Sequence, residues 1–161
     1  MPMIDLTVPK GTLSERSKAE LMGALTHTLL KWEGAGPDNR RAQSIAWTFL
    51  HEPELVTVAG RPTAEAVYRV IVGVPEGSIG DEEKQGLVAD VTEQVLRAEN
   101  PHSDPTSRAA RRVWVIIDEI ADGSWGGQGR IFRVGDILSF AGAGQDDIEV
   151  RVARLRQSAP V

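Results

Sequence analysis

The chain repeats itself along its length, and this repeat constrains the fold more than any other feature. Residues 8–14, VPKGTLS, return at an offset of 66 as residues 74–80, VPEGSIG. The stretch 47–52 returns, one residue further on, as residues 114–119, with a tryptophan at the start of both copies. Self-similarity at a fixed period over most of residues 2–125 indicates a tandem duplication.

Each copy has the pattern of a strand, a helix and a second strand. Ile4, Leu6 and Val8 alternate with polar residues, as in a half-buried strand. The apolar residues that follow have the spacing of an amphipathic helix, which we expect to begin at the N-cap Ser14 and to end near Gly34. The second-copy helix is predicted to start after Gly80, with three acidic residues in its first turn, and to end before residue 100.

A helix between two strands implies parallel pairing in a right-handed β-α-β unit. Two such units can join their sheets. The predicted fold class is therefore α+β, with tandem β-α-β repeats forming a four-stranded mixed sheet and two helices on one face. We expect one domain over residues 1–140, built from repeats at about 2–60 and 68–135, and a tail over 141–161.

Short segments outside the repeats have turn-rich compositions. Residues 55–58 followed by Gly60-Arg61-Pro62 predict a short strand and a turn, and the glycine-rich stretch 123–129 is followed by another short apolar run at 130–134. Residues 141–147 have the composition of a flexible linker. Because apolar residues alternate at 148, 150 and 152, the tail is predicted to add an edge strand or to reach a neighbouring chain.

Composition excludes several classes of function. The 18 basic and 23 acidic residues give a net charge of −5 with no basic stripe, which argues against a nucleic-acid partner. Without cysteine there is no disulfide or thiolate, and the three histidines lack metal-ligand spacing, so we expect no metal. No apolar run is long enough for a membrane span, and the first ten residues lack the pattern of a signal peptide. These features favour a cytoplasmic location.

Pro2 is the residue with unusual chemical potential. A small second residue normally allows removal of Met1, which would leave proline, with its secondary amine, at the start of the chain. An α-amino group titrates near pH 8, and burial lowers this pKa by disfavouring the cation. Such an amine can act near neutral pH as a general base, a general acid or a nucleophile. If Met1 is retained, this chemistry is impossible.

This arrangement resembles the tautomerase superfamily. An N-terminal proline opens a strand, Gly11 follows nine residues later, and a helix and a second strand complete the unit. The doubled chain is similar to fused forms of 4-oxalocrotonate tautomerase over about residues 2–135, and Trp125 falls on an aromatic position that the family places at its active site. The resemblance implies catalysis by Pro2, no cofactor, and a homotrimer of fused chains.

The sequence departs from the family at the arginines that bind substrate carboxylates. The arginine after the first-turn glycine is replaced by Thr12 in the first copy and by Ser78 in the second, and the strand arginine is replaced by Trp47 and Trp114. Arginine is hard to replace because its planar fork binds a carboxylate through two hydrogen bonds. Arg130, close to Trp125 in sequence, is the first candidate for the missing cation.

The leading hypothesis is a tautomerase in which Pro2 acts as general base on a small 2-oxo or enol carboxylic acid. Arg130 would hold the carboxylate, Trp125 and Trp114 would exclude water, and Ser78 would contribute to substrate binding. One alternative is a proline-dependent dehalogenase, hydratase or decarboxylase acting on an unsaturated or 3-oxo acid. Another is a non-catalytic oligomer that has lost its substrate arginines.

Overall fold

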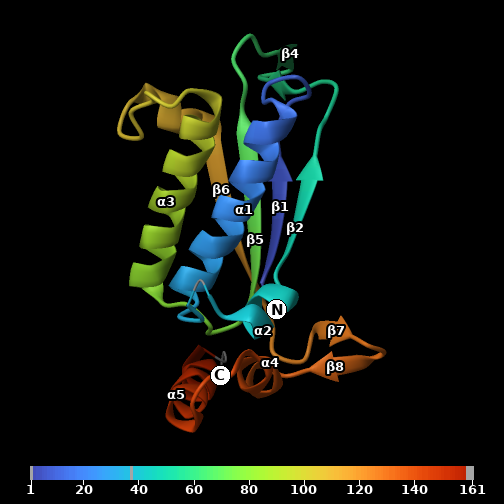
Figure 1. The fold of residues 1–161 in the computed structure, drawn as a ribbon, viewed down its shortest axis with the longest axis vertical. Coiled ribbons are helices and arrows are strands. Elements are labelled where there is room, and N and C mark those ends of the chain that lie inside the picture. The colour runs from blue at the N-terminus through green and yellow to red at the C-terminus, as the bar shows by residue number, and fades with distance from the viewer. Residues whose placement is uncertain (1, 37, 159–161) are drawn as a thin grey trace.

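The computed structural model describes residues 2–36 and 38–158. Four strands form one sheet in the order β2-β1-β5-β6, and two long helices, α1 and α3, lie across one of its faces (Figure 1). In chain order the elements are β1 (Met3–Thr7), α1 (Glu15–Trp32), α2 (Arg40–Ser44), β2 (Trp47–His51), β3 (Thr57–Val58), β4 (Arg61–Pro62), β5 (Tyr68–Pro75), α3 (Asp81–Glu99), the 3-10 helix η1 (Arg108–Arg112), β6 (Val113–Ile120), β7 (Trp125–Gly127), β8 (Arg130–Phe132), α4 (Val134–Ala141) and α5 (Gln145–Ser158).

The sheet has the symmetry that the duplication predicts. β1 pairs in parallel with β2, β5 pairs in parallel with β6, and the two units join through the antiparallel pair β1 and β5. Asp5 lies opposite Ile71, its own counterpart at an offset of 66, so the pseudo-twofold axis passes through this pair. The predicted mixed sheet of tandem β-α-β repeats, with both helices on one face, is confirmed.

The turns and helix starts repeat as well. Gly11 and Gly77, equivalent positions in the two copies, have φ angles of 80° and 72°, a region that favours glycine. The Ser14 side chain caps α1 by accepting a hydrogen bond from the Ser17 amide at 3.1 Å. At the start of α3 the Glu83 carboxylate accepts one from the Gly80 amide at 3.0 Å, the acidic half of a capping box. Both predicted helix starts are confirmed.

The core lies between the sheet and the two helices. The alternating strand residues Ile4, Leu6 and Val8 are buried, and the helix stripes pack onto them. The core members are Ile4, Leu6, Val8, Leu13, Leu21, Leu25, Leu29, Tyr68, Val70, Val72, Val74, Ile79, Leu87, Val91, Val95, Leu96 and Val113.

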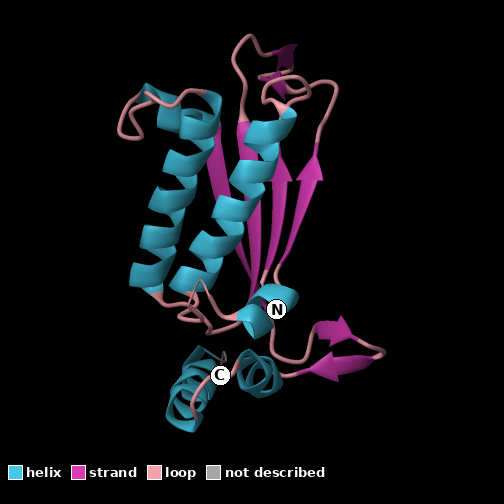
Figure 2. Ribbon diagram, in the orientation of Figure 1, coloured by secondary structure: helices cyan, strands magenta, loops and turns pink. Residues whose placement is uncertain are grey.

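The other face of the sheet carries no helix (Figure 2). Trp47 and Trp114, which occupy equivalent places on β2 and β6, are 64% and 70% exposed, and Phe49 and Ile116 are also exposed. We call these four side chains the open apolar face. An uncovered sheet face of this composition is typical of an interaction surface.

The C-terminal segment differs from the sequence prediction. Residues 145–158 form helix α5 instead of an edge strand, and α4 occupies most of the segment before it. Ile148, Val152 and Leu155 lie at i, i+4 and i+7, a helical stripe that the alternation of residues 148, 150 and 152 concealed. The flexible linker expected over 141–147 is correspondingly wrong, because only residues 142–144 separate the two helices.

The turn-rich segments form two short hairpins, β3–β4 and β7–β8. In the first, Ala59 and Gly60 both have positive φ angles, as a tight hairpin turn requires. The second projects from the end of the sheet beside α4 (Figure 1). Among the helices of residues 2–36 and 38–158, none is long and apolar enough to cross a membrane.

Candidate active site

Pro2 is buried just before β1, at the end of the sheet where α2 and α4 lie (Figure 1). Its carbonyl oxygen accepts a hydrogen bond from the Trp47 amide at 3.1 Å, which fixes the start of the strand against β2. Two hollows meet at this residue. We call them the inner cavity and the outer cleft, and Pro2, Ile45 and Ile137 line both.

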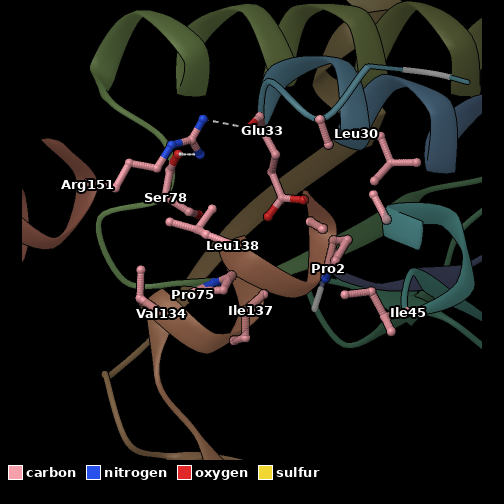
Figure 3. A pocket seen from close by; sticks show the side chains of 13 residues that line it. Pro2, Leu30, Glu33, Ile45, Pro75, Ser78, Val134, Ile137, Leu138 and Arg151 are labelled. Carbon is pink, nitrogen blue, oxygen red and sulfur yellow. Dashed lines mark hydrogen bonds between the residues drawn. The ribbon is translucent and has the colours of Figure 1, made fainter. Parts of the chain in front are cut away.

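The inner cavity is small, with a volume of about 40 Å³. Its walls are mostly apolar, and its polar groups come from Glu33, Ser78 and Arg151 (Figure 3). The complete lining is Pro2, Leu30, Glu33, Ala35, Ala42, Ile45, Pro75, Ser78, Val134, Ile137, Leu138, Ala141 and Arg151.

The outer cleft is larger, about 600 Å³, which lies within the range of small-molecule sites. Five aromatic side chains line it, and Asp136 is its one charged residue among those described. The complete lining is Pro2, Met3, Ser44, Ile45, Trp47, Phe49, Ile120, Ser124, Trp125, Gly126, Gly127, Gln128, Phe132, Asp136, Ile137 and Phe140.

Glu33 is the C-cap residue of α1, and its side chain reaches toward Pro2 (Figure 3). Burial raises the pKa of its carboxyl from 4.5 to about 7, although the nearby Arg151 guanidinium acts to lower it. No hydrogen bond from the described residues reaches this carboxyl. The carboxyl therefore titrates near neutral pH at the wall of a cavity that Pro2 shares.

Arg151 ties α5 to the site through backbone oxygens. Its Nη1 donates to the Ser78 carbonyl and its Nη2 to the Glu33 carbonyl, both at 2.8 Å (Figure 3). Its Nε donates to the Asp147 carboxylate at 3.1 Å. The first two hydrogen bonds hold the end of α1, the turn before α3 and α5 together around the inner cavity, and the third lies within α5.

The structure brings two of the predicted binding residues to Pro2 and leaves two apart. Trp125 lines the outer cleft, and Ser78 lines the inner cavity with its hydroxyl buried. Trp114 belongs to the open apolar face and lines neither hollow. Arg130 is exposed on β8, outside both hollows, with its guanidinium 4.7 Å from the ring centre of Phe132.

The second copy has no equivalent site, because Tyr68 stands where the first copy has Pro2. Its ring is buried in the core, and the Arg112 guanidinium lies 5.9 Å from the ring centre. Burial raises the pKa of the Tyr68 hydroxyl to about 12, so it stays protonated at neutral pH. Pro2 therefore marks one candidate site per chain.

Sequence reasoning missed Glu33, Arg151 and the α4 residues Ile137 and Phe140. One signal was available for Glu33, because an acid at a helix C-terminus faces the negative end of the helix dipole. Arg151 and α4 belong to the segment outside the repeat. No second copy of this segment exists in the chain, so comparison of the two copies could not indicate its structure. Among the described residues, no cluster of three or more His, Cys, Asp or Glu could hold a metal ion.

No protein-family model matches the chain, and no curated protein matches it significantly. Solved structures do match it. A fused 4-OT described as an asymmetric trimer has a TM-score of 0.64 at 20% identity, covering 80% of this chain and 94% of its own. Pt0534, inactivated by 2-oxo-3-pentynoate, has a TM-score of 0.63 at 18% identity, with the same coverage. A macrophage migration inhibitory factor-like protein from Entamoeba histolytica has a TM-score of 0.60 at 14% identity, covering 81% of this chain and 98% of its own.

These likenesses establish the class of the molecule at the level of its fold. The chain has the fold of the tautomerase superfamily in its fused, two-repeat form. About a fifth of the chain lies outside the part that matches the fused 4-OT structure.

Proposed function

We propose that this chain is a cofactor-independent tautomerase in which Pro2, freed by removal of Met1, acts as general base. The nitrogen takes a proton from a carbon beside a carbonyl and returns it to another atom of the resulting enolate. The observation that carries the proposal is the place of Pro2, buried at the junction of an aromatic-lined cleft and a small cavity. Burial there lowers the pKa of the amine by disfavouring its cation.

The proposed substrate is a small 2-oxo or enol carboxylic acid bound in the outer cleft. Trp125 would shield the reacting carbon from water, whereas Ser78 lies in the inner cavity, on the other side of Pro2 from the substrate. A carboxylate also needs a cation, which the described lining of the cleft lacks. Arg130 is exposed on the projecting hairpin, and we propose that in an assembly it supplies this cation to the cleft of a neighbouring copy.

We propose that these copies form a homotrimer. The open apolar face exposes Trp47, Phe49, Trp114 and Ile116 on one side of the sheet. Burial of such a face against other copies is favourable, at roughly 25 cal/mol per Å² of apolar surface. The similar fused 4-OT is itself described as a trimer. In this assembly each chain would supply one proline, since Tyr68 fills the second position.

The test combines intact mass with activity. Mass spectrometry of natively produced protein should show that Met1 is absent. The wild type should then accelerate ketonisation of phenylenolpyruvate or 2-hydroxymuconate, and Pro2→Ala should lower kcat/KM at least about 100-fold, the usual scale for loss of a general base. Full retention of Met1, or equal rates for the two proteins, would contradict the proposal.

A second readout does not depend on knowing the substrate. 2-Oxo-3-pentynoate, which inactivates the structurally similar Pt0534, carries an alkyne conjugated to a carbonyl. A free secondary amine would add to it, forming a nitrogen–carbon bond while the triple bond becomes a double bond and takes up a proton. We expect one added molecule per wild-type chain, located on Pro2 by peptide mapping, and slower addition to Pro2→Ala, whose N-terminal amine is primary.

Two other hypotheses remain for comparison. A dehalogenase, hydratase or decarboxylase would use the protonated form of the same nitrogen as general acid, and its activity would fall as pH rises through the Pro2 pKa. The absence of a cation from the described cleft lining favours a non-catalytic oligomer. For that class we expect neither modification by 2-oxo-3-pentynoate nor any Pro2-dependent rate.

A further inference from the structure

Pro2 separates two different environments. The outer cleft, on one side, is the space large enough for a small organic substrate, whereas the inner cavity has a volume of only about 40 Å³. The only acidic side chain in the described lining of the inner cavity is Glu33, whose carboxyl points toward Pro2 (Figure 3). A group bound to Pro2 from the cleft would therefore not meet this carboxyl directly.

The inner cavity contains polar groups that no described residue satisfies. Ser78 is only 5% exposed, and its hydroxyl oxygen has no hydrogen-bond partner among residues 2–36 and 38–158. The Glu33 carboxyl receives no hydrogen bond from the described residues. A cavity of about 40 Å³ has room for roughly two or three water molecules, and such waters occupy buried sites where two or more polar groups converge.

We propose that Glu33 is the proton partner of Pro2, sharing one proton with its nitrogen directly or through water in the inner cavity. This inference rests on the proposed function, because it requires a free amine at Pro2. Glu33 does not touch the substrate and is a positioning residue that acts through Pro2. The backbone carbonyl of Glu33 accepts a hydrogen bond from Arg151, so α5 helps to hold the end of α1 in place beside Pro2.

The charges around the inner cavity determine whether Glu33 raises or lowers the pKa of the Pro2 amine. Arg151 of α5 is the one cation in the described lining, the α4 residues of the lining are apolar, and Ser78 contributes a neutral hydroxyl. An ionised Glu33 stabilises the cationic form of Pro2 and raises the pKa of its amine, whereas a neutral side chain removes this effect. Two groups coupled in this way titrate as a pair. The carboxyl therefore sets the pH range in which Pro2 is a base.

The experiment measures Pro2 itself, so no substrate is needed. Protein lacking Met1 is labelled with ¹⁵N-proline, and the resonance of the single secondary amine is followed with pH. We expect Glu33→Gln to lower the apparent pKa of Pro2 by about one unit or more, the lower end of the effect of an adjacent opposite charge. Glu33→Asp keeps the charge on a shorter side chain and should give an intermediate value. Glu20→Gln, which removes an exposed charge from the same helix, should leave the value unchanged.

Circular dichroism and mass measurements in solution establish that each variant keeps its fold and oligomeric state. An unchanged Pro2 pKa in folded Glu33→Gln overturns the inference, as does an equal shift in Glu20→Gln. If Glu33→Gln does not fold, the Pro2 pKa of wild type is compared with that of Glu33→Asp. Equal pKa values in these two proteins would then overturn the inference. The proposed function is judged separately by the rate of Pro2→Ala, so either proposal can fail while the other stands.

Discussion

Glu33 caps the negative end of the α1 dipole beside apolar side chains, and both features disfavour its anion. Its folded-state pKa of about 7 lies above the ordinary value of 4.5, so the folded protein binds this proton more tightly than the unfolded chain. Stability gained from the neutral carboxyl is full below the ordinary pKa and is lost as pH rises toward 7.

This predicts a pH-dependent difference between wild type and Glu33→Gln. Relative to the variant, the wild type should lose free energy of unfolding between pH 5 and pH 8, on the order of 1 kcal/mol after allowance for partial exposure. Urea denaturation at fixed protein concentration and at both pH values measures this difference. Parallel stability curves for the two proteins would show that Glu33 titrates normally in the folded state.

Single residues of the site differ in how far sequence could locate them. Pro2 was singled out because a secondary amine has distinctive chemistry, and Trp125 because it falls on an aromatic position of the family that the sequence resembles. Glu33 was not identified, since its importance depends on a cavity whose other wall is formed by residues more than 100 positions later. Local pattern contains no information about that contact.

Helices α1 and α3 pack against each other through glycine as well as through their apolar stripes. A Cβ at Gly86 would lie 2.1 Å from the Trp32 ring, so this glycine permits the close approach of the two helices. Gly23, on α1, is exposed and has no atom within 4 Å of its notional Cβ. The second copy has Ala89 at the position equivalent to Gly23.

Alanine substitutions at these two glycines should have opposite effects. Gly23→Ala gains helix propensity and should stabilise the protein by about 0.5–1 kcal/mol. Gly86→Ala gains the same propensity but forces the Trp32 ring to move, and should be destabilising by about 1–3 kcal/mol. Chemical denaturation of wild type and both variants measures the two changes in the free energy of unfolding. Equal effects would mean that the Trp32 contact does not limit the packing.

At this scale the repeat explains why so much of the fold was predictable. Every strand and helix of the two β-α-β units has a partner copy, so two independent patterns support each assignment. Helices α4 and α5 have no partner copy. In α5 the apolar stripe of Ile148, Val152 and Leu155 also contains between its members a further apolar residue, Val150, which is 55% exposed. A single alternating triplet was therefore insufficient to distinguish a strand from a helix.

Considered as a whole, the molecule has one face covered by helices and one that is not. Both tryptophans of the open apolar face recur at the same register, Trp47 beside Met3 and Trp114 beside Arg69. Conservation of an exposed aromatic between the two copies of one chain suits a surface that is buried repeatedly in an assembly. The candidate site lies at one edge of this face, because Trp47 belongs to both the face and the outer cleft.

Trp114→Glu should therefore weaken the proposed trimer. Placing a charge in a buried apolar contact is strongly unfavourable without a partner, so we expect a shift to monomers at micromolar concentration. Val88→Glu introduces the same charge at an exposed position on α3 and should leave the assembly intact. Light scattering coupled to size exclusion measures both. A wild type that is itself monomeric, or trimeric Trp114→Glu, would exclude this surface as the interface.

The inner cavity joins opposite ends of the chain, and this gives its assembly an order in time. Pro2 leaves the ribosome before α4 and Arg151, which follow it roughly ten seconds later at ordinary rates of synthesis. During that interval the start of the chain has no α4 or α5 beside it. The proposed removal of Met1 therefore has time to occur before α4 and α5 pack beside Pro2. After folding is complete, Pro2 is buried and an aminopeptidase has poor access to it.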